Sequence, residues 1–129
     1  AGYENAWPSD LSGGMRQRAA FLRTALCDAD ILLLDEPFGA LDVISRGDMQ
    51  DWLVSMKRHL GRTCLLVTHD IAEAISLSDR IVVLSRRPAT VRSVHTLTEL
   101  DGIPPLERRD TPVFHTLFNT VWKELNDNA

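Results

Sequence analysis

At 129 residues the chain is long enough to bury a hydrophobic core, and it corresponds to one domain or to part of one. A hydrophobic fraction of 44% and a charged fraction of 25% are ordinary for a globular protein. The net charge of -4 argues against a nucleic-acid-binding protein, in which basic side chains are in excess. No apolar run approaches the roughly 20 residues that a membrane-spanning helix requires. The 2 cysteines, Cys27 and Cys64, are far apart, which predicts buried, reduced thiols rather than a disulfide or a metal site.

The first regular elements are a helix and a strand. The apolar spacing predicts a helix from Gly13 to about Leu26, after a polar lead-in. Its expected buried face contains Met15, Ala19, Leu22 and Leu26. The run Ile31–Leu34 is continuously apolar, which is typical of a parallel strand covered on both faces. Pro37 and Gly39 end that strand.

Helices and strands then alternate. A second helix is predicted from about Ser45 to Leu60, and Gly61 ends it. It is followed by a strand at Thr63–Val67, a short helix around Ile71–Leu77 and a strand at Arg80–Leu84. Alternating strands and helices predict an α/β fold with a mostly parallel sheet.

The character of the chain changes after Pro88. The stretch VRSVHTL predicts one more strand, a turn-rich charged segment follows, and Thr111 to Leu125 is expected to form a closing helix. The expected buried face of this helix contains Phe114, Leu117, Phe118, Val121, Trp122 and Leu125. We therefore divide the chain into residues 1–87 and a C-terminal extension, residues 88–129.

The motif ILLLDEP places two acidic residues at the end of a buried strand. In α/β sheets this is the edge at which ligands bind. Asp35 is suited to hold a Mg²⁺ ion, directly or through water, and Glu36 is suited to polarise a water molecule that attacks a phosphate. The alternative is a helix cap or a surface salt bridge, which is the more common role of such a pair.

The motif LLVTHD places His69 at the end of the next strand. A histidine at this position can donate a hydrogen bond to a phosphate oxygen. Taken alone, a histidine at a strand end more often has a structural role. The other histidines, His59, His95 and His115, lie in no such setting and are assigned no function.

The motif LSGGMRQR opens the first helix. Ser12 is placed as an N-cap, and Gly13 and Gly14 leave the first backbone N–H groups accessible. A helix N-terminus with accessible amides and a nearby hydroxyl can bind an anion such as phosphate. The alternative is an ordinary capped helix.

These motifs, in this order, resemble the nucleotide-binding subunit of ABC transporters. The resemblance implies that residues 11–17 are the signature motif, which contacts ATP, and that residues 38–42 are the D-loop. It assigns ATP contacts to Ser12, Gly13, Gly14, Gln17 and Asp42. It makes Glu36 the catalytic base, His69 the switch histidine, and Asp35 of the Walker B strand the Mg²⁺ ligand, through water. Gly39 departs from the family pattern, in which a serine commonly begins the D-loop.

The phrases DEPFGALD, SRRP and RDTPVF resemble importers of the nitrate, sulfonate, taurine or thiamine-precursor type. The resemblance implies a three-layer P-loop NTPase-like fold, ATP and Mg²⁺ as cofactors, and a head-to-tail dimer with a second ATPase subunit. It also implies transmembrane permease subunits as partners, a solute-binding protein indirectly, and no nucleic acid. The expected location is the cytoplasm, peripheral on the inner face of the cell membrane.

The Walker A loop, G-x-x-x-x-G-K-[ST], is absent, because none of the 7 glycines precedes a lysine. In the family this loop precedes the signature, so we expect the chain to be the C-terminal part of a longer subunit. The family's phosphate-loop strand would lie between the strands Thr63–Val67 and Arg80–Leu84. Its loss would leave strand edges open, which predicts a marginal, self-associating or rearranged chain.

The resemblance implies that Ser12 and Gly14 act on ATP held by a partner subunit, while Asp35, Glu36 and His69 act on a loop that this chain lacks. Two alternatives stay open. The chain is a non-catalytic fragment that binds or regulates a full-length ATPase, or it is an ABC-type ATPase outside transport.

Overall fold

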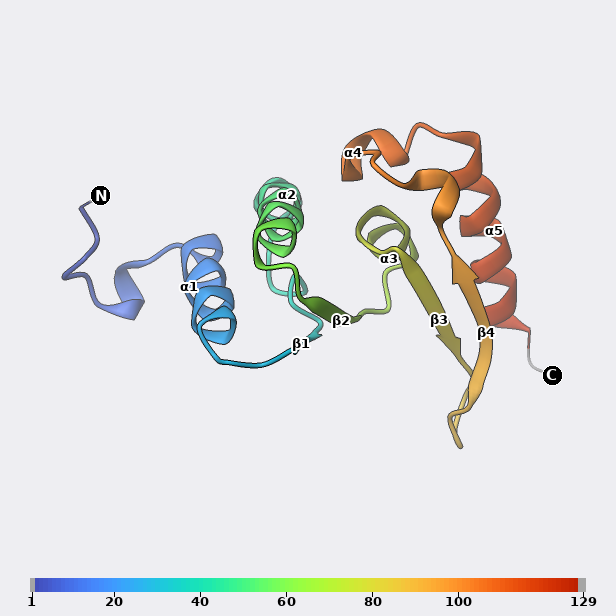
Figure 1. Cartoon of the computed structure of the whole chain (residues 1–129), viewed down its shortest axis with the longest axis horizontal. Coiled ribbons are helices and arrows are strands. Elements are labelled where there is room, and N and C mark those ends of the chain that lie inside the picture. The colour runs from blue at the N-terminus through green and yellow to red at the C-terminus, as the bar shows by residue number, and fades with distance from the viewer. Residues whose placement is uncertain (1, 128–129) are drawn as a thin grey trace. The chain divides into compact units, whose positions relative to one another are not determined.

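The computed structural model describes residues 2–127, which form two compact units. The first unit extends to Val67 and the second begins at Thr68, and each is described by itself. Figure 1 labels their helices and strands. The predicted α/β fold is confirmed, but within these residues the predicted mostly parallel sheet is instead one parallel strand pair and a separate antiparallel pair. The division of the chain after residue 87, which rests on motifs, stays a prediction.

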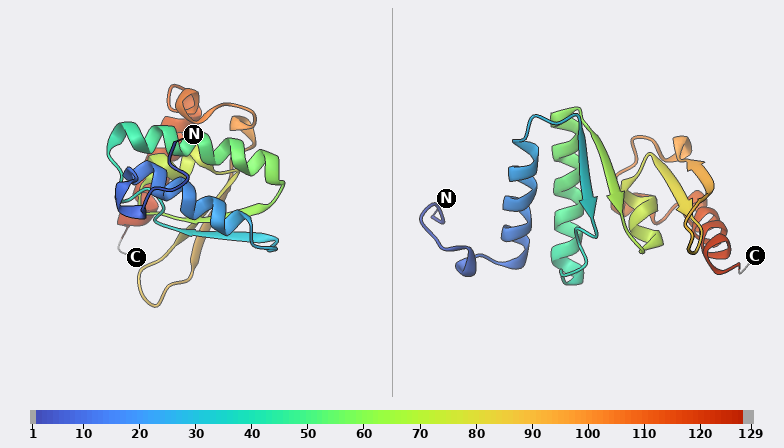
Figure 2. Two further views of the ribbon diagram at one scale, coloured as in Figure 1. Left: turned by 90° about the vertical axis from the view of Figure 1, so that its left-hand side faces the viewer. Right: turned by 90° about the horizontal axis from the view of Figure 1, so that it is seen from below.

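The first unit is a βαβ arrangement preceded by a helix. Its elements are the 3-10 turn η1 (Pro8–Asp10), α1 (Gly13–Ala25), β1 (Ile31–Asp35), α2 (Val43–Leu60) and β2 (Thr63–Val67). β1 and β2 pair in parallel, in a register that runs from Ile31↔Thr63 to Asp35↔Val67. The helices α1 and α2 lie side by side (Figure 2).

Local capping explains where these elements begin and end. Ser12 is the N-cap of α1, and its hydroxyl accepts a hydrogen bond from Met15 N. Gly61 ends α2 in the left-handed conformation at φ 60, where glycine has no steric penalty, and its N–H bonds to Lys57 O. The predicted N-cap and the predicted helix stop are therefore confirmed.

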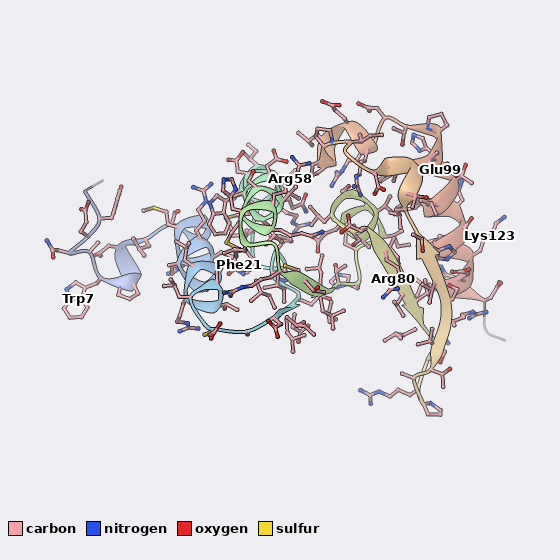
Figure 3. All side chains as sticks on the ribbon, viewed as in Figure 1. Trp7, Phe21, Arg58, Arg80, Glu99 and Lys123 are labelled. Carbon is pink, nitrogen blue, oxygen red and sulfur yellow. The ribbon has the colours of Figure 1, made fainter. Side chains whose placement is uncertain are left out.

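The core of the first unit is made by alternate strand residues and by aromatic rings. Phe21 lies between α1 and α2 (Figure 3), where it stacks on Trp52 and meets Phe38 edge to face. Buried aliphatic side chains complete this core: Leu32, Leu34, Met49 and Leu53. The core holds the turn after β1 against both helices.

Two predictions about buried faces in this unit are wrong. β1 was expected to be covered on both faces, but its burial alternates, and Ile31 and Leu33 are 57% and 69% exposed. In α1 the buried residues are Phe21 and Ala25, whereas Leu22 and Leu26 are exposed. Because α2 contacts α1 through the aromatic Phe21, the helix turns the leucines of its expected stripe outward.

The second unit is a hairpin packed against helices. Its elements are α3 (Ile71–Leu77), β3 (Arg80–Leu84), β4 (Val91–Thr96), η2 (Thr98–Leu100), α4 (Pro105–Arg108) and α5 (Pro112–Asn126). β3 and β4 are antiparallel and form a sheet separate from β1 and β2. Its buried core consists of Ile75, Ile81, Val83, Leu97, Leu100, Phe114 and Val121. Of the predicted buried face of α5, Phe114, Leu117, Phe118 and Val121 pack in or against this core, whereas Trp122 and Leu125 are exposed.

A buried arginine joins the C-terminal segment to α3. Arg108 is only 7% exposed, and its Nη1 donates to Ile75 O at 3.1 Å and to Ser78 O at 2.8 Å. Its Nε donates to Ile103 O at 2.9 Å. Because the last carbonyl groups of a helix have no partner within the helix, this guanidinium acts as the C-terminal cap of α3.

The cysteines are both free, as predicted, but they are less buried than expected. Cys27 is exposed, and Cys64 is half-buried in β2. Burial raises the pKa of the Cys64 thiol, against the opposing effect of the Lys57 charge. No helix within residues 2–127 combines the length and the apolar character needed to cross a membrane.

Candidate functional site

The N-terminus of α1 carries the predicted anion-binding residues. Ser12 has an extended backbone, and its Oγ accepts from Met15 N at 3.2 Å. A Cβ atom added at Gly14 would meet nothing within 4 Å, and one added at Gly13 would lie 3.4 Å from Leu41 Cδ2. The backbone around Gly14 is therefore open to a ligand, as the interpretation of this helix end requires.

The turn after β1 carries the two predicted acidic residues, and both are exposed. β1 ends at Asp35, and Glu36 adopts φ 45, in the left-handed region. Such a backbone costs a non-glycine residue about 1–3 kcal/mol, and a following proline restricts it further. Two hydrogen bonds hold this conformation, from Glu36 N to Val67 O at 2.8 Å and from Gly39 N to Glu36 O at 3.3 Å.

The donor chemistry of this turn suits a hard cation. Asp35 and Glu36 present carboxylate oxygens at the end of β1, and oxygen is the ligand atom that Mg²⁺ prefers. Within residues 2–127 no cluster of three or more potential metal ligands occurs. Mg²⁺ is commonly bound by one or two carboxylates together with water and substrate phosphates, so a cluster of protein ligands is not needed.

Gln17 contacts the backbone of this turn. Its side-chain Nε2 donates to Pro37 O at 2.6 Å, across 20 positions of sequence. The residue lies on α1, one turn beyond the two glycines, and it is half-buried. The structure thus brings the N-terminal helix end and the acidic turn together within the first unit.

Asp42 caps the helix that follows the turn. Its Oδ1 accepts from Ser45 N at 2.8 Å, and its Oδ2 accepts from Ser45 Oγ at 3.1 Å. The hydrogen bond from the Ser45 backbone, followed by that from its hydroxyl, lowers the pKa of the Asp42 carboxyl. The adjacent Leu41 carbonyl accepts from Arg46 Nη2 at 3.1 Å, which fixes the same corner.

Sequence reasoning did not identify the residues that anchor the acidic turn. Phe38 is 1% exposed, and its ring lies 6.1 Å from that of Phe21. The signal was available, because a phenylalanine between Pro37 and Gly39 is unusual in an exposed turn and indicates burial.

His69 belongs to the second unit. It is exposed, and it lies between β2 and α3. The residues on either side of it order the start of α3: Asp70 N donates to Thr68 Oγ1, and Asp70 Oδ1 accepts from Glu73 N at 3.0 Å. His69 is therefore placed on a capped turn, with its role as a switch histidine still a prediction.

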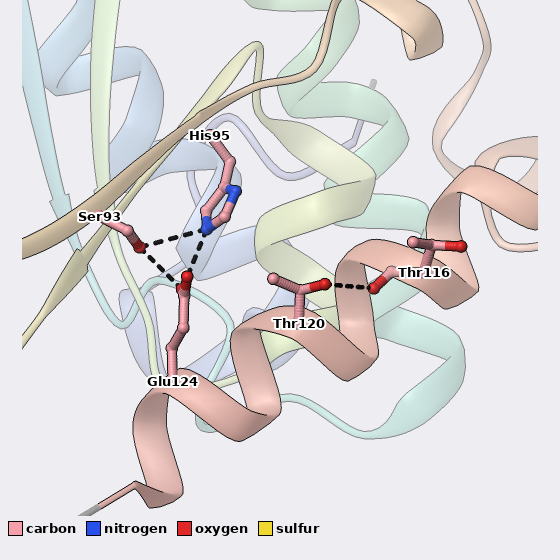
Figure 4. A network of polar contacts seen from close by, with 5 residues as sticks. All are labelled: Ser93, His95, Thr116, Thr120 and Glu124. Carbon is pink, nitrogen blue, oxygen red and sulfur yellow. Dashed lines mark hydrogen bonds and ion pairs between the residues drawn. The ribbon is translucent and has the colours of Figure 1, made fainter. Parts of the chain in front are cut away.

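A polar network that the sequence did not predict joins β4 to α5. Glu124 Oε2 lies 3.0 Å from His95 Nε2 and accepts from Ser93 Oγ at 2.7 Å (Figure 4). Ser93 Oγ also lies 3.2 Å from the same ring nitrogen. In a serine-histidine-acid triad the acid and the hydroxyl contact different ring nitrogens. Here both contact Nε2, so the network fastens α5 rather than activating a nucleophile.

The comparisons with known proteins connect these motifs to one family. Residues 3–39 match the family described as ABC transporter. The chain is 45% identical over 124 residues to the uncharacterized ABC transporter ATP-binding protein YtlC of Bacillus subtilis, covering 95% of this chain and 48% of that protein. It is 50% identical over 108 residues to the formylaminopyrimidine import ATP-binding protein ThiZ of Halalkalibacterium halodurans, covering 84% and 41%.

A third relative is the aliphatic sulfonates import ATP-binding protein SsuB of Bacillus licheniformis, which is 45% identical over 123 residues. That match covers 95% of this chain and 47% of SsuB. The chain thus spans about half the length of the curated relatives that it matches.

Proposed function

Because this chain belongs to the family of ABC transporter ATP-binding proteins, we propose that it is part of an ATP-binding subunit that couples ATP hydrolysis to solute import. The family match and the import proteins among the relatives support this proposal. In the complete subunit the two units would belong to a three-layer P-loop NTPase-like fold. This chain would be the C-terminal part, with residues 88–129 as an extension.

The residues of the acidic turn would act on the subunit's own nucleotide. Asp35 would hold Mg²⁺ through water, and Glu36 would be the general base for the attacking water molecule. His69 would donate a hydrogen bond to the terminal phosphate. Mg²⁺ would neutralise charge that develops on the phosphate oxygens. Asp42 would support this site as the cap of α2, close in sequence to the acidic turn.

The N-terminus of α1 would act on ATP bound to a second subunit. Ser12, Gly13 and Gly14 present a hydroxyl and an open helix end, which suit the terminal phosphate of a nucleotide held by a head-to-tail partner. The further partners would be transmembrane permease subunits and, through them, a solute-binding protein. The subunit would then lie on the cytoplasmic face of the membrane.

One observation carries the proposal furthest. The helix that begins after Ser12 and the turn with Glu36, which are far apart in sequence, are joined by the Gln17–Pro37 hydrogen bond. An ordinary capped helix and an ordinary surface acid pair would not need this contact.

Mg-ATP binding and turnover by the chain itself test the proposal first. Because the sequence has no Walker A loop, we expect neither binding nor turnover. Turnover that disappears in Glu36→Gln would mean that phosphates are held in another way, and it would contradict the proposed division of labour.

A chimera tests the catalytic assignment. In it, this chain replaces the matching part of the SsuB relative, which supplies the remaining half of the subunit. We expect ATP hydrolysis that Glu36→Gln lowers by about 100-fold or more, as for loss of a general base. A folded chimera without ATPase activity, or one that is insensitive to Glu36→Gln, would contradict the proposal.

The second candidate function is a non-catalytic half-site that completes the ATP site of another subunit. The exposed Ser12 and the open backbone at Gly14 favour it. Adding this chain to full-length SsuB would then raise or lower its ATPase activity, and Ser12→Arg would abolish the effect. No change at any ratio of the two proteins would exclude this function.

A further inference from the structure

The backbone hydrogen bonds of the strained turn after β1 run to β2 and within the turn, so its contact with α1 needs a side chain. Glu36 N continues the ladder toward β2, and Gly39 N closes the turn on Glu36 O. Pro37, which lies between them, has no N–H group, so its backbone can only accept a hydrogen bond. Gln17 supplies that donor from α1.

The contact is short and is partly shielded from water. The distance from Gln17 Nε2 to Pro37 O is 2.6 Å, Pro37 is buried, and Gln17 is half-buried. Next to it, the edge-to-face pair of Phe21 and Phe38 fixes the spacing between α1 and the turn. Because the rings set the distance and the amide sets the direction, the carbonyl of Pro37 is constrained in position and in orientation.

The same helix connects Gln17 rigidly to the open N-terminus at Ser12 and Gly14. A displacement of that helix end would therefore be transmitted to the Pro37–Phe38 peptide group, one residue beyond Glu36. We infer that Gln17 is a positioning residue that fixes the backbone of Glu36 relative to the N-terminus of α1, and that it does not contact the nucleotide. This inference rests on the proposed function and gives Gln17 a different task from the ATP contact that the family resemblance implies.

Amide exchange in this chain tests the structural half of the inference. Gln17→Met keeps the length of the side chain but removes the donor. We expect the Gly39 amide, which bonds to Glu36 O, to exchange about tenfold faster, since it depends on the conformation of the turn. The Gly61 amide at the end of α2 should be unchanged, and Arg18→Met on an exposed site of α1 should change neither.

A general loss of stability would accelerate exchange at Gly39 and Gly61 together, and an unchanged Gly39 would show that the hydrogen bond does not hold the turn. Either result overturns the inference. Gln17→Glu provides a second variant. The carboxylate of this variant repels the Pro37 carbonyl, whereas its protonated form donates an O–H. We therefore expect the Gly39 amide of the variant to exchange faster than that of the unaltered chain at neutral pH. The ratio of the two exchange rates should decrease when the pH is lowered below about 4.

Steady-state kinetics of the SsuB chimera test the functional half. We expect Gln17→Met to lower kcat about tenfold with an unchanged KM for ATP, because a positioning residue acts on the step that Glu36 performs. A raised KM with an unchanged kcat would mean that Gln17 contacts ATP and would overturn the inference. An active chimera that is indifferent to Gln17→Met refutes the inference alone. An inactive parent chimera refutes the proposed function, and amide exchange then decides the role of Gln17.

Discussion

Phe38 is the residue on which the acidic turn depends most. Its ring is almost completely buried and packs on Phe21, although Glu36 and Gly39 of the same turn are exposed. Phe38→Ala removes a buried aromatic ring, and such a change costs about 3–5 kcal/mol in the free energy of unfolding. Urea denaturation followed by circular dichroism measures this loss.

Trp7→Ala is the matched control, since Trp7 is an aromatic residue of the same unit that is 76% exposed. It should change the free energy of unfolding by no more than about 0.5 kcal/mol. An equal effect of the two substitutions would show that the packing of Phe38 does not stabilise the turn.

Asp42 ties the turn to α2, and its contribution depends on pH. The hydrogen bonds from Ser45 lower the pKa of the Asp42 carboxyl below its ordinary value of 3.8. The stability that the ionised carboxylate provides is therefore complete above pH 3.8 and is lost as the pH falls through the lowered pKa. Asp42→Ala should lower Tm at pH 7, while Asp42→Asn, which keeps an accepting oxygen, should lower it less. Thermal melts at pH 7 and pH 3 compare the variants.

At pH 3 the difference in Tm between Asp42→Ala and the unaltered chain should be smaller. Asp48→Ala, at an exposed position inside α2, serves as the control. A difference in Tm that is the same at both pH values would mean that the ionised carboxylate is not the capping group.

Residue-scale features divide into those with a local signal and those without one. Ser12 as a cap and Gly61 as a stop were predictable, because each acts on backbone groups within a few positions of itself. The Gln17–Pro37 contact was not, because it forms only after α1 has packed next to the turn. A hydrogen bond across 20 positions leaves no periodicity in the sequence.

At the scale of elements, the sequence predicts which helices and strands exist and their order. It predicts less well which face of each helix or strand is buried. Alternation of apolar runs with helical patterns predicted every strand from β1 to β4 within a residue or two. The buried face of α1 was wrong because an aromatic contact between Phe21 and Trp52 outweighs a stripe of leucines. Packing partners decide such faces, and the sequence does not name them.

The pairing of β4 with α5 is expected to be sensitive to acid. Burial disfavours the ionised form of Glu124, but the hydrogen bonds from His95 and Ser93 and the charges of His95 and Arg92 outweigh it and lower the pKa of this carboxyl. A lowered pKa means that the stabilisation is complete above about pH 4.5 and is lost as the pH falls through the lowered value. Hydrogen exchange of the α5 amides measures the docking of α5.

Glu124→Gln should remove this dependence of stability on pH. We expect the variant to be less stable than the unaltered chain at pH 7, and the difference in stability between the two to become smaller toward pH 3. The matched control is Glu99→Gln, since Glu99 is an exposed carboxylate in η2 of the same unit. A constant difference across this pH range would show that the ionised Glu124 contributes nothing to docking.

At the scale of the whole molecule, each of the two sheets presents one apolar face to solvent. The exposed apolar side chains are Ile31, Leu33, Leu65 and Val67 on the first strand pair and Val82, Leu84, Val91 and Val94 on the second. For the continuous apolar run Ile31–Leu34 we expected cover on both faces, and here the prediction and the structure disagree. The chain spans about half the length of its relatives, and we expect the remainder of such a subunit to cover these faces.

Exposed apolar faces of this kind predict self-association of the chain. Light scattering after size exclusion should detect species larger than a monomer at micromolar concentration. The double substitution Leu33→Thr with Leu65→Thr, at cross-strand partners, should shift the population to monomer without lowering Tm. Leu32→Thr, at a buried position of the same strand, should unfold the first unit. A monomeric parent chain would contradict this prediction.

Arg108 has a consequence for how such chains can recombine. Its guanidinium belongs to the C-terminal extension, yet two of its acceptors are the carbonyls of Ile75 and Ser78 at the end of α3. Suppose that two relatives exchanged their C-terminal extensions, residues 88–129, by a crossover just after Pro88. The carbonyls at the end of α3 would then lose their donor unless the incoming extension carried an arginine in the same place. A lysine would not replace it fully, because a single ammonium nitrogen cannot also make the bond to Ile103 O that the Nε of the planar guanidinium makes. We therefore expect a permissive crossover point ahead of α3, with α3 and the C-terminal extension exchanged as one segment.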